Sequence, residues 1–219
     1  MKRYLTFIVL VMLSSTLWAQ SEFFNTIEFI NNTREDIIYL FFSPADSEYW
    51  GPDVLGDSRT LSSKGSIEFF ISYPNETDSF DFMAIDTSGN VYEIYEESIT
   101  DEYAAQIVIN KTSKSDEIDL DSLEEELIGL EIINETGLEL YYLFMSPSDS
   151  EMYGIDFMDS ETTLQPGASV SVLLFNSNAE VDYDIQGMDA EDDTFSFSLT
   201  LDPELEYQFV EITMDDLDF

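Results

Sequence analysis

Short runs of alternating apolar and polar residues, bounded by turn-forming residues, recur along the chain. A period of two residues predicts β-strands. Ile37–Ser43 is apolar on both faces, which is typical of a strand buried on both sides. The tetrapeptide Thr87–Asn90 favours a hairpin turn. The first half is therefore predicted to contain six strands, at Ile27–Asn31, Ile37–Ser43, Ser66–Ser72, Phe80–Asp86, Val91–Glu96 and Ala104–Asn110.

The strand pattern occurs twice, at an offset of 103 residues. Ile27–Leu61 aligns with Leu130–Leu164 without a gap, and sixteen of the 35 aligned positions are identical. This duplication predicts an all-β protein with two tandem, immunoglobulin-like β-sandwich domains of about six strands each. We place the domains at residues 24–110 and 129–213, an acidic linker at 111–128 and an acidic tail at 214–219. Each domain can bury only a modest core, which favours packing of the two domains against each other. The alternative is two separate domains on a flexible linker.

The first residues have the pattern of an export signal. Lys2 and Arg3 precede the apolar run Tyr4–Leu13, and Leu17–Ala19 ends in the small residue that signal peptidases prefer. We therefore predict a signal peptide over residues 1–19 and a periplasmic or extracellular protein. No later stretch is apolar for long enough to cross a bilayer, so no membrane insertion is expected after the signal is removed.

Charge and composition exclude several functions. The chain has 47 acidic and seven basic residues, a formal net charge of −40, and neither Cys nor His. It therefore has no disulfide, thiol nucleophile or Ser-His-Asp triad, and no basic surface for nucleic acid. We favour an acidic surface screened by counter-cations, with binding of Ca²⁺ or of a cationic partner as the alternative. After the predicted leader the only basic residues are Arg34, Arg59, Lys64, Lys111 and Lys114.

An acidic loop motif follows the second predicted strand in both copies. It reads SPADSEYWGPD over 43–53 and SPSDSEMYGID over 146–156. Its carboxylates are candidate calcium ligands, because Ca²⁺ prefers hard oxygen donors. A short capped helix is the interpretation we favour, with Ser43 as N-cap, Pro44 in the first turn and Gly51 at the end. The candidate metal ligands are Asp46, Glu48, Asp53, Asp149, Glu151 and Asp156.

Aromatic residues in the same loops are candidates for binding a partner. Tyr49, Trp50 and Tyr153 could stack on a sugar or on a side chain of another protein. Alternatively, they plug the end of a sandwich, which we favour because such side chains carry a large apolar area.

Turn chemistry accounts for two other polar motifs. Asp189, Glu191, Asp192 and Asp193 form either a weak cation site or a solvated hairpin turn, and we favour the turn. Asn31-x-Thr33 and Asn134-x-Thr136 are likewise read as turns.

The chain resembles a family of small secreted bacterial β-rich domains. The family pattern is N-x-T-G, then L-Y-x-S-P, W-G-x-D-x-L-G and a later L-x-x-G. Both copies follow it, with departures at Arg34, at Tyr153 and at Met158 and Asp159. The resemblance implies a β fold and export, and it implies no particular activity. In the first copy the matching residues are Asn31, Thr33, Leu40, Ser43, Pro44, Trp50, Gly51, Asp53, Leu55 and Gly56.

These features predict a secreted, acidic, non-catalytic protein that binds a ligand or has a structural role in the cell envelope, with calcium as a possible stabiliser. A carbohydrate-binding module or adhesin, with a protein or glycan partner, is one alternative. A hydrolase that uses paired carboxylates on sugar-like substrates is the other. We expect no enzyme, because the loop acids recur in both copies whereas a catalytic pair normally occurs once in a cleft.

Overall fold

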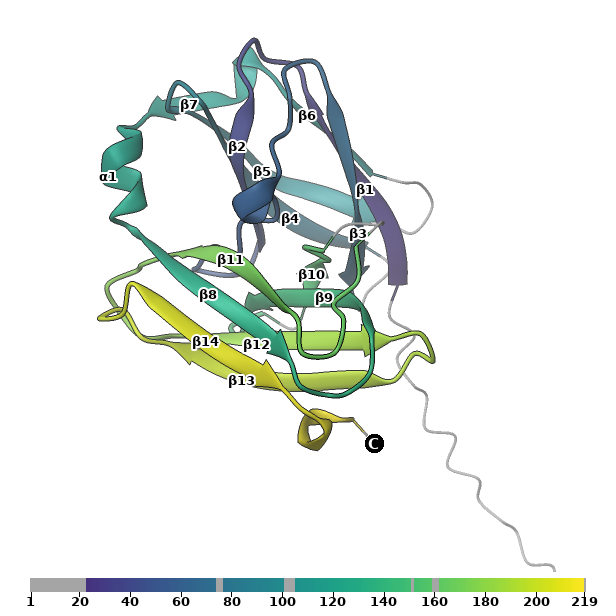
Figure 1. Ribbon diagram of the computed structural model, residues 1–219. Helices are drawn as coiled ribbons and strands as arrows, with labels where there is room; N and C mark the ends of the chain where they lie inside the picture. The colour runs from purple at the N-terminus through teal and green to yellow at the C-terminus, as the bar shows by residue number, and fades with distance from the viewer. Residues whose placement is uncertain (1–22, 74–76, 101–104, 151, 159–161, 219) are drawn as a thin grey trace, which may run out of the picture.

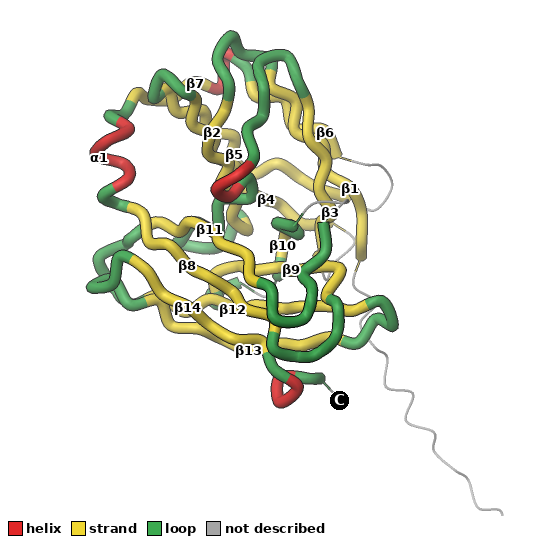
Figure 2. The backbone as a smooth tube through the Cα atoms, viewed as in Figure 1, coloured by secondary structure: helices red, strands yellow, loops and turns green. Residues whose placement is uncertain are grey.

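A computed structural model describes residues 23–73, 77–100, 105–150, 152–158 and 162–218, and nearly all of the regular secondary structure is β-strand (Figures 1 and 2). The predicted all-β class with two sandwich-like domains is confirmed. The predicted signal peptide lies outside the described residues. Among the described residues, no helix has the length and apolar character needed to span a bilayer.

The first half forms two facing sheets. The central strand of one sheet, β1, pairs antiparallel with β3 and parallel with β6. In the other sheet β4 lies between β2 and β5, antiparallel to both. All six strands overlap the strands predicted from sequence. Their bounds are β1 (Phe23–Asn31), β2 (Ile37–Pro44), β3 (Ser66–Tyr73), β4 (Thr77–Asp86), β5 (Asn90–Thr100) and β6 (Ala105–Ile109).

The second half repeats this arrangement. One sheet has the order β11-β8-β14 and the other β13-β12-β9. β9 and β11 begin 103 residues after β2 and β3, so the sequence duplication extends to the fold. The strands are β8 (Leu127–Asn134), β9 (Leu140–Pro147), β11 (Ser169–Phe175), β12 (Val181–Asp189), β13 (Thr194–Leu201) and β14 (Tyr207–Ile212).

The strand order is related to that of an immunoglobulin domain. The pair β1–β3 and the sheet β2-β4-β5 correspond to strands B–E and C-F-G of that fold. β6 lies where strand A would lie, although it runs parallel to β1. The place of strand D, beside β3, is taken by β10 (Gly154–Ile155), which comes from the second half of the chain. The two halves therefore share one sheet.

The segment between the halves is structured. η2 (Lys111–Ser113) leads into β7 (Lys114–Glu117), which pairs with β5. α1 (Leu120–Glu124) follows, visible at the left of Figure 1, and buries Leu123. The helix begins after Asp119, inside the segment predicted as an acidic linker. The predicted domain boundaries stay a prediction, but residues 111–124 are not an extended tether.

The two halves pack against each other. One cluster of buried apolar residues contains members of both halves, among them Phe29, Phe82 and Tyr183. A second cluster, around Phe41, includes Leu123 and Leu127. The ring of Phe41 lies 4.5 Å from that of Phe175. Of the two arrangements left open by the sequence, the structure has the packed one.

Candidate functional site

Two buried aspartates fix the loops that meet between the halves. The Asp53 Oδ1 atom accepts hydrogen bonds from the backbone N–H groups of Leu40, at 2.8 Å, and Leu55, at 3.1 Å. Asp156 Oδ1 accepts equivalent bonds from Leu143 and Met158, both at 3.1 Å. Each carboxylate therefore ties its loop to the preceding strand, β2 or β9.

The same loops bind the opposite half through their backbones. The Asp53 N–H donates to the carbonyl of Leu173 at 2.9 Å, and the Asp156 N–H donates to the carbonyl of Phe70 at 2.9 Å. These bonds are equivalent under the 103-residue offset. β10 extends the second contact by pairing with β3. The interface therefore consists of two reciprocal loop exchanges.

Arg59 lies where the two loops meet. Its guanidinium donates to the carbonyls of Leu55, at 3.0 Å, and Val54, at 2.8 Å, in the first half. It also donates to the carbonyls of Met158, at 3.0 Å, and Phe157 in the second half. The two pairs of carbonyls are repeat equivalents, so one cation joins matching groups of both halves.

Burial dominates the electrostatics of Asp53. Burial raises the pKa of its carboxyl from 3.8 to about 7, against the lowering effects of the Leu40 and Leu55 N–H groups and of Arg59. Its Oδ2 atom is buried and has no hydrogen-bond partner among the described residues. The carboxyl group therefore changes its protonation near neutral pH.

The predicted metal ligands are distributed over two environments. Asp53 and Asp156 are buried in the interface, whereas Asp46, Glu48 and Asp149 are exposed. Asp149 Oδ2 accepts a hydrogen bond from the Glu48 N–H at 2.9 Å, across the halves. Glu151 lies outside the described residues. Within the described part of the chain, no three carboxylates gather closely enough to hold a metal ion. A calcium site stays a prediction.

The helix predicted at the start of this motif is wrong. β2 continues to Pro44, and a turn follows over Ala45 and Asp46. The Ser43 hydroxyl donates to the carbonyl of Tyr49 at 2.5 Å instead of capping a helix, and its equivalent Ser146 donates to the carbonyl of Met152. The serine closes the loop because its hydroxyl competes for backbone groups.

An aromatic pocket opens between the halves beside this loop. It has a volume of about 290 Å³. Tyr49 and Trp50 are half-buried and pack against the core, so they act as a plug and also line the pocket. The Tyr183 hydroxyl donates to the Trp50 carbonyl at 2.9 Å. Tyr153, the third aromatic candidate, is not among the lining residues. These are Glu48, Tyr49, Trp50 and Met83 from the first half and Phe175, Ser177 and Tyr183 from the second.

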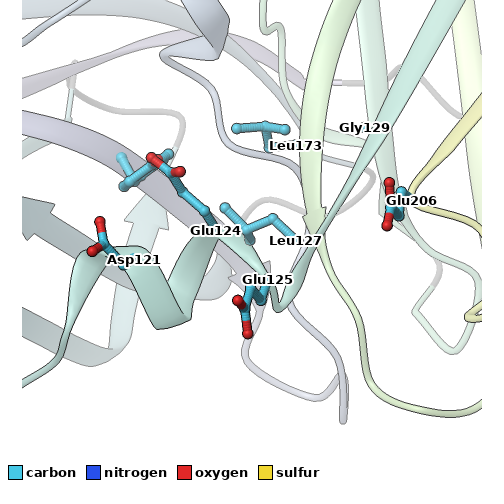
Figure 3. A pocket seen from close by; sticks show the side chains of 8 residues that line it. Asp121, Glu124, Glu125, Leu127, Gly129, Leu173 and Glu206 are labelled. Atoms are coloured by element: carbon cyan, nitrogen blue, oxygen red, sulfur yellow. The ribbon is translucent and has the colours of Figure 1, made fainter.

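Two more cavities were not predicted from sequence. An acidic one of about 810 Å³ lies beside α1, where Asp121 and Glu124 project from the helix and Glu206 lies on the far side (Figure 3). The other, of about 350 Å³, is lined by Arg34, Lys111 and Lys114. The residues that line each cavity are distant in the sequence, so no local motif predicts them. For the cavity with basic residues, the scarcity of Lys and Arg in the chain is the sequence feature that could have drawn attention to Arg34, Lys111 and Lys114.

The polar turn motifs are hydrogen-bonded turns. Asp189 Oδ1 accepts from the N–H groups of Glu191, at 2.8 Å, and Asp193, at 3.1 Å. Asn31 Oδ1 accepts from the Thr33 N–H and hydroxyl, at 2.9 and 2.7 Å, and Asn134 and Thr136 repeat the arrangement. These contacts agree with the turn interpretation of both motifs.

Comparisons with known proteins assign no function. No protein-family profile and no curated protein sequence matches the chain. An NMR structure of a protein from Eubacterium rectale is 18% identical, with a TM-score of 0.30, over 42% of this chain and 84% of that one. A candidate adhesin from Bacteroides ovatus is 8% identical, with a TM-score of 0.28, over 89% of this chain and 91% of that one. Superpositions this loose assign neither a family nor a ligand.

Proposed function

We propose that this is an exported, non-catalytic binding protein whose ligand occupies the aromatic pocket between its two halves. The observation that carries the proposal is the composition of that pocket. Trp50 and Tyr49 of the first half and Tyr183 and Phe175 of the second line one cavity, together with the polar groups of Glu48 and Ser177. Apolar walls with a few polar groups are the usual character of a small-molecule site.

The lining residues favour a sugar-like ligand. Aromatic rings offer a flat apolar face, and a sugar ring presents a matching face of C–H groups with hydroxyls at its edge. The Glu48 carboxylate can accept hydrogen bonds from hydroxyls, and the Ser177 hydroxyl can donate or accept. A volume of about 290 Å³ is at the lower end for ligand pockets, which suits one sugar residue.

The same pocket disfavours the hydrolase alternative. Glycoside hydrolysis requires two carboxyl groups on either side of the bond that is cleaved. Glu48 is the only carboxylate among the described residues that line this cavity. Binding without cleavage is therefore the function that we propose, and a protein or glycan outside the cell is the expected partner.

Fluorescence gives a direct test, because Trp50 is the only tryptophan after the predicted leader. Residues 20–219 would be titrated with neutral mono- and oligosaccharides while tryptophan emission is recorded. We expect a saturable change that Tyr49→Ala weakens at least fivefold. Tyr141→Ala, at a 41% exposed tyrosine on β9, is the matched control and leaves affinity unchanged. If no sugar changes the emission, or if both variants weaken binding equally, the proposal is wrong. Release of free sugar would instead support a hydrolase.

A further inference from the structure

Three basic residues gather around one pocket in a chain that is otherwise acidic. Arg34 lies in the turn between β1 and β2, Lys111 follows β6 in η2, and Lys114 begins β7. All three line a cavity of about 350 Å³, whose other lining residues are Thr33, Glu35, Asn90 and Tyr92. They are three of the five basic residues beyond the predicted leader, so the small positive charge of the chain is concentrated here.

Two of these cations have no partner in the described structure. Within the described residues, neither the Arg34 guanidinium nor the Lys111 ammonium makes a hydrogen bond or an ion pair. Lys114 contacts the Asn90 side chain and pairs with Glu117 at 3.2 Å, an exposed contact. The two remaining cations are engaged with backbone carbonyls, Arg59 at the interface and Lys64 at Asn32. Both unpartnered cations therefore line the cavity, beside the partnered Lys114.

The floor of the pocket consists of buried, uncharged side chains that lie above the buried Asp86 carboxylate. The Thr33 hydroxyl donates to Asn31 Oδ1 at 2.7 Å. The Tyr92 hydroxyl donates to Asp86 Oδ2 at 2.8 Å. Burial, and then the bond to Asp86, raise the pKa of Tyr92 to about 12, which keeps this hydroxyl protonated. Glu35 is the only acidic residue in the described lining, so the positive side chains outnumber it.

The second half lacks this arrangement although it has the same fold. The repeat equivalents of Arg34, Lys111 and Lys114 are Gly137, Met214 and Leu217. Leu217 forms a bridge with Phe195, the equivalent of Tyr92, and packs against the core. The cationic pocket is therefore not a by-product of the fold, because the duplicated domain replaces the same positions with apolar residues and glycine.

We propose that the Arg34–Lys111–Lys114 pocket binds a compact anionic ligand that carries a carboxylate, sulfate or phosphate group. Exposed cationic side chains around uncharged lining groups complement an anion, and arginine matches planar or tetrahedral oxyanions in particular. The ligand is small because a net charge of −40 repels polyanions over about a Debye length of 10 Å at 0.1 M salt. This site is independent of the aromatic pocket.

NMR titration of the ¹⁵N-labelled chain, residues 20–219, tests the proposal. The probes are inorganic phosphate, sulfate and galacturonate, each compared with chloride at equal ionic strength. We expect saturable shifts of the Arg34 side chain and of the Thr33–Glu35 and Asn90 amides. Shifts with phosphate and sulfate alone indicate an oxyanion site, and shifts with galacturonate alone indicate a carboxylate site; either result supports the proposal. No response beyond that to chloride would overturn it.

Single-charge variants locate the site. Arg34→Gln and Lys111→Gln should each weaken binding of the responding anion about tenfold. Lys64→Gln removes one charge outside the pocket and should change affinity less than twofold. If all three variants lose the same affinity for the anion, overall charge accounts for the binding and the proposal is overturned. Tryptophan emission should not respond to these anions, so failure here is distinguishable from failure of the sugar site.

Discussion

Replacement of Arg59 tests how the two halves are held together. Arg59→Met keeps most of the apolar stem but removes the donors to four carbonyls, two in each half. It also removes a cation that lies 5.4 Å from the centre of the Phe69 ring. Hydrogen bonds from charged groups contribute about 1.5–3 kcal/mol each when measured singly, but they are not additive and Arg59 is only half-buried. We therefore expect a loss of about 3 kcal/mol, which is ~6–12 °C for a chain of this size.

Thermal unfolding, followed by circular dichroism, measures the loss of stability in Arg59→Met. Arg34→Met is the matched control, because it removes the same charge from an exposed side chain and should change the free energy of unfolding by less than about 0.5 kcal/mol. Trp50 emission provides a second measurement, since the Tyr183–Trp50 hydrogen bond crosses the interface. In Arg59→Met we expect the emission to change before the β-sheet signal is lost. Similar midpoints for the two variants would refute the assigned role of Arg59.

Three further predictions concern stability. Because the pKa of Asp53 is about 7 in the folded chain and 3.8 for an unperturbed aspartate, the folded state keeps a proton that the unfolded state loses. Its contribution to the free energy of unfolding is complete below pH 4 and falls by about 1.4 kcal/mol per pH unit up to pH 7. Urea unfolding at several pH values should therefore show the wild type losing stability relative to Asp53→Asn across this range. Parallel pH profiles of the two proteins would contradict the prediction. Repulsion between the acidic side chains should make the thermal unfolding midpoint rise as NaCl is added, and MgCl₂ and CaCl₂ at equal concentration should raise it equally. A clearly higher midpoint in CaCl₂ than in MgCl₂ would instead establish the predicted calcium site. Asn31→Ala removes four hydrogen bonds of a buried side chain, and it should cost about 3 kcal/mol in chemical denaturation; a cost below about 1 kcal/mol would show that the turn does not depend on this side chain.

The strands could be predicted because their signal is local. Alternation and turn residues placed all six strands of the first half, and the repeat transferred them to the second. β10 was missed because two residues, Gly154 and Ile155, are too short to show a period. The helix expected after Ser43 was wrong because capping residues also form hydrogen-bonded loops, and the tertiary fold decided between the two.

The interface and the pockets could not be predicted for a different reason. Arg59 binds backbone carbonyls, which every residue possesses, so no pattern of side chains in the sequence predicts this contact. Arg34 and Lys111 are far apart in the chain, and they meet because β6 pairs with β1, which places Ile109 opposite Asn31. Lys114 joins them because β7 pairs with β5. Tyr49 and Trp50 were identified as candidates, but their partners Phe175 and Tyr183 depend on how the halves dock.

A fluorescence titration with variants from both halves tests the central claim most directly, because that claim is a ligand site shared between the two repeats. Trp50 emission would be followed in the wild type, in Tyr49→Ala and in Ser177→Ala, with the sugar that gives the largest response. We predict saturable binding that weakens at least fivefold in Tyr49→Ala and measurably in Ser177→Ala, since both line the cavity. Unchanged affinity in both variants, or no saturable response in the wild type, would contradict the account.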